Sequence, residues 1–287
     1  MDSAVPGATS GTDMDAAPTP PVAEPAASAA AFPLLAVRDL SRRYAGLVAL
    51  TGYRLDLAAG TIHGVIGPNG AGKTTLFNLL SGMVKPTTGS IVLDGREMTG
   101  LRPAEVAQAG IARTFQNIRL FGDMSVLDNV RVATQRHLPG PLWAALLSTR
   151  GFRARERESV VRAERMLHLV GLAHHGHRPA RSLPYGEQRR LEIARAVAVE
   201  PRILMLDEPN AGMNPTETAD LLGLIRRIRD EIGITIIMVA HDIPLVMGLC
   251  DRIQVLNYGQ LIADGVPSAV RNDPAVIAAY LGQARQA

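Results

Sequence analysis

Cysteine and long apolar runs are almost absent from this 287-residue sequence. The single cysteine, Cys250, excludes an internal disulfide and fits a reducing compartment. No stretch reaches the run of roughly 18 apolar residues that a membrane-spanning helix requires, because even the apolar segment 233–250 is interrupted by Asp242 and Pro244. If the protein serves a membrane, separate subunits must therefore cross it.

Lysine is also scarce, since Lys73 and Lys85 are the only lysines among 30 basic residues. The net charge is only +3, although the isoelectric point is about 9.3. The arginines are not gathered into a conspicuous basic cluster, which is the feature that a nucleic-acid-binding surface requires. We therefore expect no nucleic-acid partner.

The first 32 residues are rich in Ala, Pro, Ser, Thr and Gly, and they carry acidic residues where an export signal would carry positive charge. This composition predicts a disordered tail over residues 1–32. The remainder, residues 33–287, contains no internal repeat and is predicted to be one α/β domain.

Short β-like runs alternate with helical patterns in that domain, which predicts a mainly parallel sheet with helices on both faces. The segment GSIVLDGREMTG, residues 89–100, has a hairpin-like pattern. From about Asn117 to Arg181 the pattern becomes helical, with charged runs such as RARERESVVRAERMLHLVGL. We therefore divide the domain into a core, residues 33–116 and 182–287, and an inserted helical subdomain, residues 117–181.

A phosphate-binding loop follows the predicted strand IHGVI and opens a predicted helix. Its glycines allow backbone N–H groups to converge on phosphate oxygens, and Lys73 reaches the β- and γ-phosphates. The hydroxyl of Thr74 is placed to bind Mg²⁺. ATP with Mg²⁺ is thus the predicted ligand, held by nine consecutive residues: Gly67, Pro68, Asn69, Gly70, Ala71, Gly72, Lys73, Thr74 and Thr75.

Acidic residues follow the apolar strand ILML, and a histidine ends the next predicted strand. Asp207 can hold Mg²⁺ through water, and Glu208 can polarise the attacking water. Because neighbouring parallel strands end at one edge of a sheet, His241 is predicted to lie near both carboxylates, where it could contact the γ-phosphate. Gln116 lies where the core passes into the helical subdomain, and its chemistry alone assigns it no role.

These motifs, in this order, resemble those of the ATP-binding cassette (ABC) family from about Pro33 to Gly282. The resemblance implies a P-loop NTPase fold with a mainly parallel core sheet, an antiparallel β subdomain and an inserted α-helical subdomain. It implies that Tyr44 stacks on adenine, that Gln116 reaches Mg²⁺ and the attacking water, and that His241 is the switch histidine. Residues 210–214, NAGMN, look like the loop that crosses to a partner cassette.

The family signature LSGGQ is altered here to LPYGE, beginning at Leu183. In the family this loop lies across the dimer interface from the partner's ATP, and Pro184 offers neither the hydroxyl nor the backbone N–H of the usual serine. Tyr185 replaces the first glycine. We therefore predict a competent site built on Lys73 and Glu208, a weaker site completed by this signature, and a second, different cassette as partner.

Four strings narrow the resemblance further: LPYGEQRRLEIARA, DEPNAGMNPTET, ARTFQNIRLFGDMSVLDNV and VLNYGQLIADGVPSAVRNDPAVIAAYLG. Together they look like an ATPase subunit of branched-chain amino acid importers. The implied partners are two transmembrane permease subunits, a second ATPase subunit and, indirectly, a periplasmic solute-binding protein. The implied location is the cytoplasmic face of the inner membrane. Cassettes for amide or urea uptake or lipopolysaccharide export, and soluble ABC ATPases acting on ribosomes or DNA, remain alternatives.

Overall fold

A computed structural model describes residues 32–134 and 150–284. The tail predicted for residues 1–32 lies outside the described residues, apart from Phe32. None of the helices within the described ranges is long and apolar enough to cross a bilayer.

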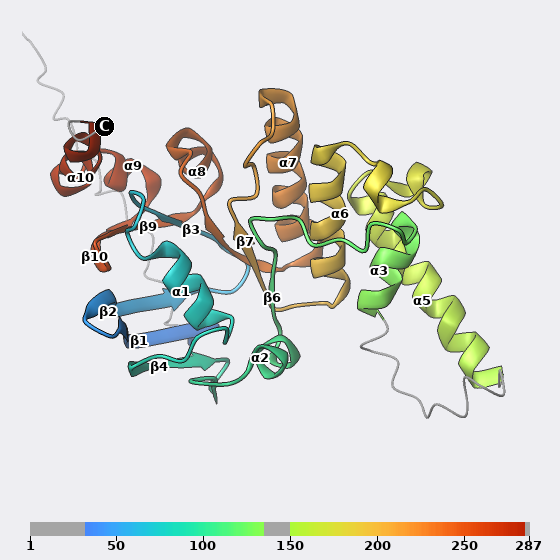
Figure 1. The fold of residues 1–287 in the computed structure, drawn as a ribbon, viewed down its shortest axis with the longest axis horizontal. Helices are drawn as coiled ribbons and strands as arrows, with labels where there is room; N and C mark the ends of the chain where they lie inside the picture. Colours follow the sequence, from blue (N-terminus) through green and yellow to red (C-terminus); the bar gives the residue numbers. More distant parts are fainter. Residues whose placement is uncertain (1–31, 135–149, 285–287) are drawn as a thin grey trace, which may run out of the picture. The chain divides into compact units, whose positions relative to one another are not determined.

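The centre of the fold is a six-stranded sheet in the order β10-β9-β3-β8-β7-β6 (Figure 1). Five of its strands run parallel, and β10 joins the edge antiparallel to β9. The strands are β3 (Ile62–Ile66), β6 (Ile111–Arg113), β7 (Ile203–Asp207), β8 (Thr235–Val239), β9 (Arg252–Asn257) and β10 (Gln260–Gly265). The prediction of a mainly parallel sheet is confirmed.

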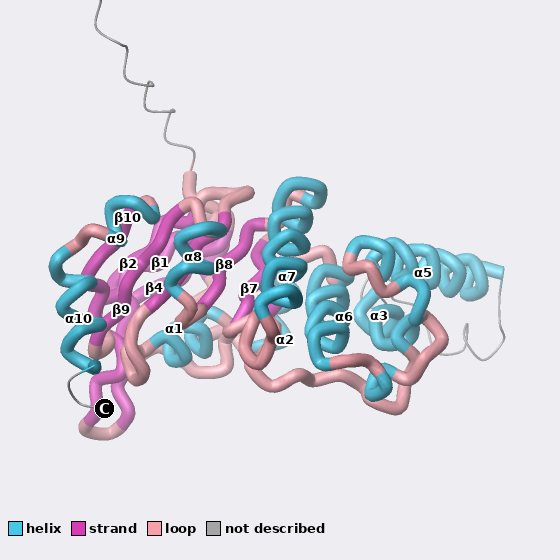
Figure 2. The backbone as a smooth tube through the Cα atoms, turned by 90° about the horizontal axis from the view of Figure 1, so that it is seen from above, coloured by secondary structure: helices cyan, strands magenta, loops and turns pink. Residues whose placement is uncertain are grey.

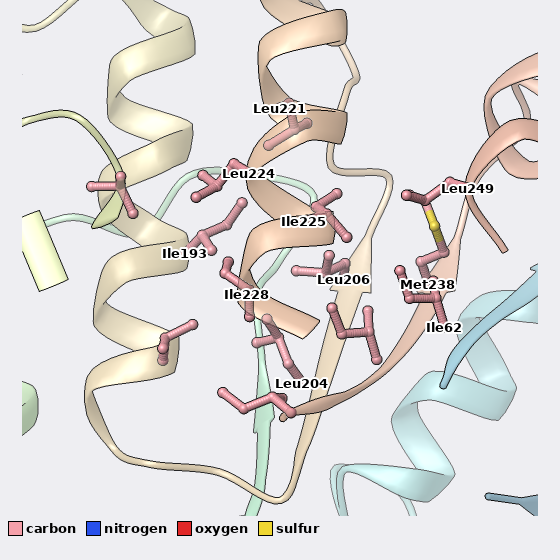
Figure 3. Packing of buried hydrophobic residues seen from close by; sticks show 14 of the residues in the cluster. Ile62, Ile193, Leu204, Leu206, Leu221, Leu224, Ile225, Ile228, Met238 and Leu249 are labelled. Atoms are coloured by element: carbon pink, nitrogen blue, oxygen red, sulfur yellow. The ribbon is translucent and has the colours of Figure 1, made fainter. Parts of the chain in front are cut away.

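The three central strands β3, β8 and β7 are buried along their whole length, which explains why β7 is an apolar run instead of an alternating pattern. In β7, Ile203 and Met205 belong to one hydrophobic cluster, and Leu204 and Leu206 belong to the other. The second cluster contains the apolar residues of α6 (Tyr185–Ala198), α7 (Pro215–Arg227) and α8 (Ile243–Leu249). Figure 3 shows Leu204 and Leu206 packed against the buried face of α7.

The opposite face of the sheet packs against α1 (Lys73–Leu80) and a separate antiparallel sheet in the order β2-β1-β4-β5. Figure 2 places these elements apart from α6 and α7. The strands of the second sheet are β1 (Leu35–Tyr44), β2 (Leu47–Leu57), β4 (Thr88–Leu93) and β5 (Arg96–Glu97). The hairpin-like segment is thus the β4–β5 hairpin of an antiparallel β layer.

The helical segment begins later than its sequence pattern suggests. Residues 114–125 form an irregular loop, and the first helix is α3 (Val126–Thr134). Ser125 caps α3, because its Oγ accepts a hydrogen bond from the Asp128 backbone N–H at 3.0 Å. The long charged run forms α5 (Arg150–Leu169).

Short helices complete the described chain. They are α2 (Pro103–Ala109), two 3-10 turns (Ala173–His175 and Ala180–Ser182), a π-helical turn after α7 (Ile228–Ile232), α9 (Pro267–Arg271) and α10 (Pro274–Ala284).

Candidate functional site

Four neighbouring parallel strands, β6, β7, β8 and β3, end at one edge of the central sheet. Each is followed by a segment that the sequence singles out: the loop with Gln116, the Asp207–Glu208 pair, His241 and the phosphate-binding loop. Strand order therefore brings together groups from four separate regions of the chain, as expected at the carboxyl edge of such a sheet.

Two glycines fix the shape of the phosphate-binding loop. At Gly67, with φ of 153°, a Cβ would lie 2.1 Å from the Leu256 carbonyl oxygen. At Gly72, which precedes α1 with φ of 102°, a Cβ would lie 2.7 Å from the carbonyl oxygen of Ala49. Any larger residue would force the loop away from β2 and β9, so the glycines permit close packing as well as the tight turn.

Lys73 is buried at the start of α1, and its Nζ donates hydrogen bonds to the carbonyl oxygens of Gly67 and Pro68 at 2.5 and 2.8 Å. Burial lowers the pKa of Lys73, and the nearby carboxylates of Glu208 and Asp207 act in the opposite direction. The ammonium is thus held against the backbone of the phosphate-binding loop.

A pocket of about 410 Å³ opens beside this loop and is lined also by Tyr44 and Glu208. The Arg42 guanidinium lies 4.5 Å from the centroid of the Tyr44 ring, which supports the ring from one side. The volume falls within the usual range for small-molecule sites. The structure therefore places the predicted adenine-stacking residue, the phosphate loop and Glu208 around one cavity.

Tyr258 and Gly259 also line this pocket, although no sequence motif indicated them. They form the turn between β9 and β10, where Gly259 N donates to the Ala71 carbonyl oxygen at 2.9 Å. Thr51 N donates to the Gly259 carbonyl oxygen at 2.8 Å. The Asn-Tyr-Gly turn was a usable signal for a hairpin, but not for its position beside the pocket.

Glu208 is the meeting point of the predicted catalytic side chains. Its Oε2 accepts a hydrogen bond from Gln116 Nε2 at 2.9 Å, and its Oε1 lies 3.0 Å from His241 Nδ1. Glu208 adopts a left-handed φ of 47°, a conformation that costs free energy for a residue with a side chain. The backbone is thus constrained in a way that fixes one carboxylate between an amide and an imidazole.

Asp207 also makes a contact that was not predicted from the sequence. Its Oδ2 pairs with Arg113 Nη2 at 2.7 Å, and the two side chains are only 11% and 7% exposed. The residues are 94 positions apart in the chain. Adjacent placement of β6 and β7 creates the pair, so local sequence carries no signal for it.

Side chains of α6 form hydrogen bonds with the backbone of the loop that carries Gln116. The buried Arg189 guanidinium donates to the carbonyl oxygens of Phe115 and Gln116, both at 2.6 Å, and pairs with Glu192 at 2.8 Å. The backbone N–H of Phe115 donates to Glu192 at 3.4 Å. One helix therefore orients the backbone on both sides of the peptide that presents Gln116.

The oxygen donors at this edge are of the kind that magnesium takes. No cluster of three or more His, Cys, Asp or Glu side chains suited to a metal is found within residues 32–134 and 150–284. Magnesium typically takes one or two carboxylates together with hydroxyl, water and phosphate oxygens. Thr74, Asp207 and Gln116 supply oxygen donors of this kind.

Comparison with known families gives two matches. Residues 50–211 match the family described as ABC transporter, and residues 260–285 match the family described as branched-chain amino acid ATP-binding cassette transporter. The second match begins at β10 and includes α9 and α10, and thus lies outside the sequence motifs that surround the pocket.

Known relatives extend over most of the chain. The high-affinity branched-chain amino acid transport ATP-binding protein LivG of Salmonella typhimurium is 48% identical over 88% of this chain and 99% of its own length. The lipopolysaccharide export system ATP-binding protein LptB of Acidithiobacillus ferridurans is 35% identical over 87% and 95%. The crystal structure of the ADP conformation of MJ1267, a cassette of an ABC transporter, superimposes with a TM-score of 0.75 at 30% identity, over 87% of this chain and 98% of that one.

Proposed function

Because the chain belongs to the ABC transporter family of ATP-binding cassettes, we propose that it hydrolyses ATP to drive the import of branched-chain amino acids. The observation that carries the hydrolytic part is the convergence of Gln116 and His241 on the Glu208 carboxylate beside the phosphate-loop pocket. The likeness to LivG and the match at the C-terminal end support the choice of solute.

ATP occupies the 410 Å³ pocket in this proposal, with its base against Tyr44. Lys73 exchanges the carbonyl oxygens of Gly67 and Pro68 for β- and γ-phosphate oxygens. Thr74, Asp207 and Gln116 would hold Mg²⁺, directly or through water. When bound, the metal neutralises the charge that develops on the phosphate oxygens.

Glu208 then orients and polarises a water molecule for attack on the γ-phosphorus. The water gives one proton to the Glu208 carboxylate as its oxygen bonds to phosphorus, the bond to the β–γ bridging oxygen breaks, and ADP and inorganic phosphate result; the proton then passes from Glu208 to solvent. His241 and Gln116 keep the Glu208 carboxylate in place during this step, because each contacts a different carboxylate oxygen.

In this proposal a permease subunit docks in a groove between α2 and α6, which has a volume of about 650 Å³. We call it the α2–α6 groove; it is lined by Ser81, Met83, Pro103, Ala104, Val106, Ala107, Gln108, Ile111, Ala112, Arg113, Phe115, Arg119, Ala133, Glu192, Arg195, Ala196 and Val199. Because Phe115 adjoins Gln116, a permease helix seated there would press on the loop that contacts Glu208. The chain would then act at the cytoplasmic face of the inner membrane.

The test is to isolate the tagged chain from native membranes with its partners, reconstitute the complex in liposomes and measure ATP hydrolysis with different solutes. We expect two permeases and a second cassette in the complex, and stimulation by leucine, isoleucine or valine. Stimulation by urea or a short amide would instead support the alternative importer class. Recovery of ribosomal or DNA-bound partners would contradict the transport function.

A further inference from the structure

Arg113 is the side chain that joins the α2–α6 groove to the carboxyl edge of the sheet. It is the last residue of β6 and lines the groove. Its Nη2 nevertheless donates to Asp207 Oδ2 at 2.7 Å. One guanidinium thus contributes to the wall of the groove and to the surroundings of the carboxylate that our proposal assigns to Mg²⁺.

The guanidinium is held in one orientation by contacts on three elements. Its Nη1 donates to Asn78 Oδ1 at 2.8 Å and to Ser81 Oγ at 3.0 Å, both at the end of α1. The rings of Phe77 and Phe115 lie 5.4 and 5.2 Å from its central carbon. A displacement of Phe115 or Ser81, which also line the groove, would therefore move the group that pairs with Asp207.

Because the pair is buried, a change in the distance between the two charged groups changes their interaction energy more than it would at the surface. The side chains of Arg113 and Asp207 are 7% and 11% exposed, and water offers them little compensation. The Arg113 fork reaches Asp207, Asn78 and Ser81 at once, which a lysine ammonium on its flexible stem cannot reproduce. Arg113 consequently fixes which way the Asp207 carboxylate faces.

We propose that Arg113 is a positioning residue that transmits the occupancy of the α2–α6 groove to Asp207, and thereby sets how strongly Mg²⁺ supports nucleotide binding. This inference rests on the proposed function, since that function supplies the permease in the groove and the metal beside Asp207. The groove can then influence the site in two ways. One is the contact between the Gln116 loop and Glu208, and the other is the contact between Arg113 and Asp207.

The test uses the full chain with Arg113→Lys, which keeps the charge and loses the fork. Calorimetry measures the affinity of a non-hydrolysable ATP analogue in EDTA and in Mg²⁺. We expect the affinity in EDTA to be retained and the enhancement by Mg²⁺ to fall roughly 10- to 100-fold, as for other groups that orient metal-binding carboxylates. In the assembled complex, the ratio of solute-stimulated to basal ATP hydrolysis should fall as well.

Arg202→Lys is the matched control, because Arg202 pairs with Asp94 on the surface, where the two side chains are 48% and 59% exposed. It should leave the Mg²⁺ enhancement unchanged. Arg113→Met removes the charge as well as the fork. Its nucleotide affinity is measured by the same calorimetry, and its thermal unfolding is measured in parallel. An Arg113→Lys protein with lower thermal stability but normal Mg²⁺ enhancement and normal stimulation would overturn the proposal.

The two proposals fail in distinguishable ways. If wild-type complexes show no solute-stimulated hydrolysis, the importer function fails, whatever the variants do. If the wild type is stimulated and Arg113→Lys behaves like Arg202→Lys, the importer function stands and the role of Arg113 fails.

Discussion

At the scale of single residues, Glu208 concentrates several unusual features. It has a left-handed backbone conformation, it is contacted by an amide on one oxygen and an imidazole on the other, and it adjoins the buried Arg113–Asp207 pair. Strained and highly constrained residues of this type tend to occur at functional sites, where the surrounding structure holds them in place. The geometry is what a group that must orient one water molecule requires.

Glu208→Gln should abolish most hydrolysis while leaving nucleotide binding intact, because an amide keeps the shape but cannot accept a proton. We expect the turnover rate to fall roughly 10²- to 10⁴-fold, the usual contribution of a general base. Turnover and analogue affinity should be measured on the same preparation, with Glu200→Gln on the surface as control. Near-normal turnover would remove Glu208 from the catalytic role.

His63 lies in β3, the strand that precedes the phosphate-binding loop, and it should make the stability of the folded protein sensitive to acid. It is buried, and burial lowers its pKa from 6.5 to about 4. The folded protein therefore holds a neutral imidazole, whereas the unfolded chain takes up a proton below about pH 6.5. The free energy of unfolding should be unaffected by His63 above that pH and should fall by up to about 3 kcal/mol as the pH drops towards 4.

Urea unfolding across pH 4 to 7 provides the measurement for this. In His63→Gln the fall over that interval should be smaller by the same amount, since no imidazole remains to titrate. Equal slopes for wild type and His63→Gln would contradict the assignment.

At the scale of elements, α6 connects two parts of the predicted machinery. Its first residue, Tyr185, belongs to the altered signature, and its second turn carries Arg189. Arg189 Nη2 donates to the Tyr185 hydroxyl at 3.2 Å and to the Gln116 carbonyl oxygen at 2.6 Å. The helix thus links the surface that a partner cassette would face with the loop of this chain's own site.

Breaking the buried pair on α6 should cost more than removing it entirely. Arg189→Met leaves the Glu192 carboxylate buried without its counter-ion, and we expect a loss of about 3–5 kcal/mol in the free energy of unfolding. Adding Glu192→Leu should restore part of that loss. Urea unfolding of the two single variants and the double variant forms the thermodynamic cycle, and additive losses would contradict the pairing argument.

At the scale of the whole molecule, the proposed function requires two cassettes. In such a dimer the N-terminus of α6 would face the partner's ATP. Pro184 precedes this helix and Tyr185 opens it, with the ring of Tyr185 about 3.4 Å from where a Cβ on Gly212 would lie. The first backbone N–H groups of a helix have no partner inside it, so this end keeps donors even though the serine hydroxyl is missing.

Restoring the signature with Pro184→Ser and Tyr185→Gly should raise hydrolysis at the site that this loop completes. One added hydrogen bond to a charged phosphate is worth about 1.5–3 kcal/mol, so an increase of about tenfold or more is expected. In the assembled complex, Glu208→Gln silences the site built on this chain, and the remaining turnover reports the other site. Equal effects on the two sites would contradict a weaker second site.

Features whose chemistry is local could be predicted from the sequence. The phosphate-binding loop is recognisable because its glycines, Lys73 and Thr74 are consecutive and lie between a strand and a helix. Asp207 and Glu208 follow the apolar run ILML, and the alternation of β-like runs with helical patterns predicted a mainly parallel sheet. The start of α3 at Val126 was missed, although the Ser125 and Asp128 spacing that caps it is itself a local signal.

Contacts between strands and helices that are distant in the chain could not be predicted, because they depend on how the chain folds. Arg113 meets Asp207 because β6 lies beside β7, Arg189 reaches Gln116 because α6 packs behind the loop, and Tyr258 reaches the pocket through a hairpin. Such contacts depend on strand order and helix packing, which no spacing along one sequence encodes. For this reason the motifs identify the predicted catalytic and metal-binding residues, whereas the fold determines which other side chains hold those residues in place.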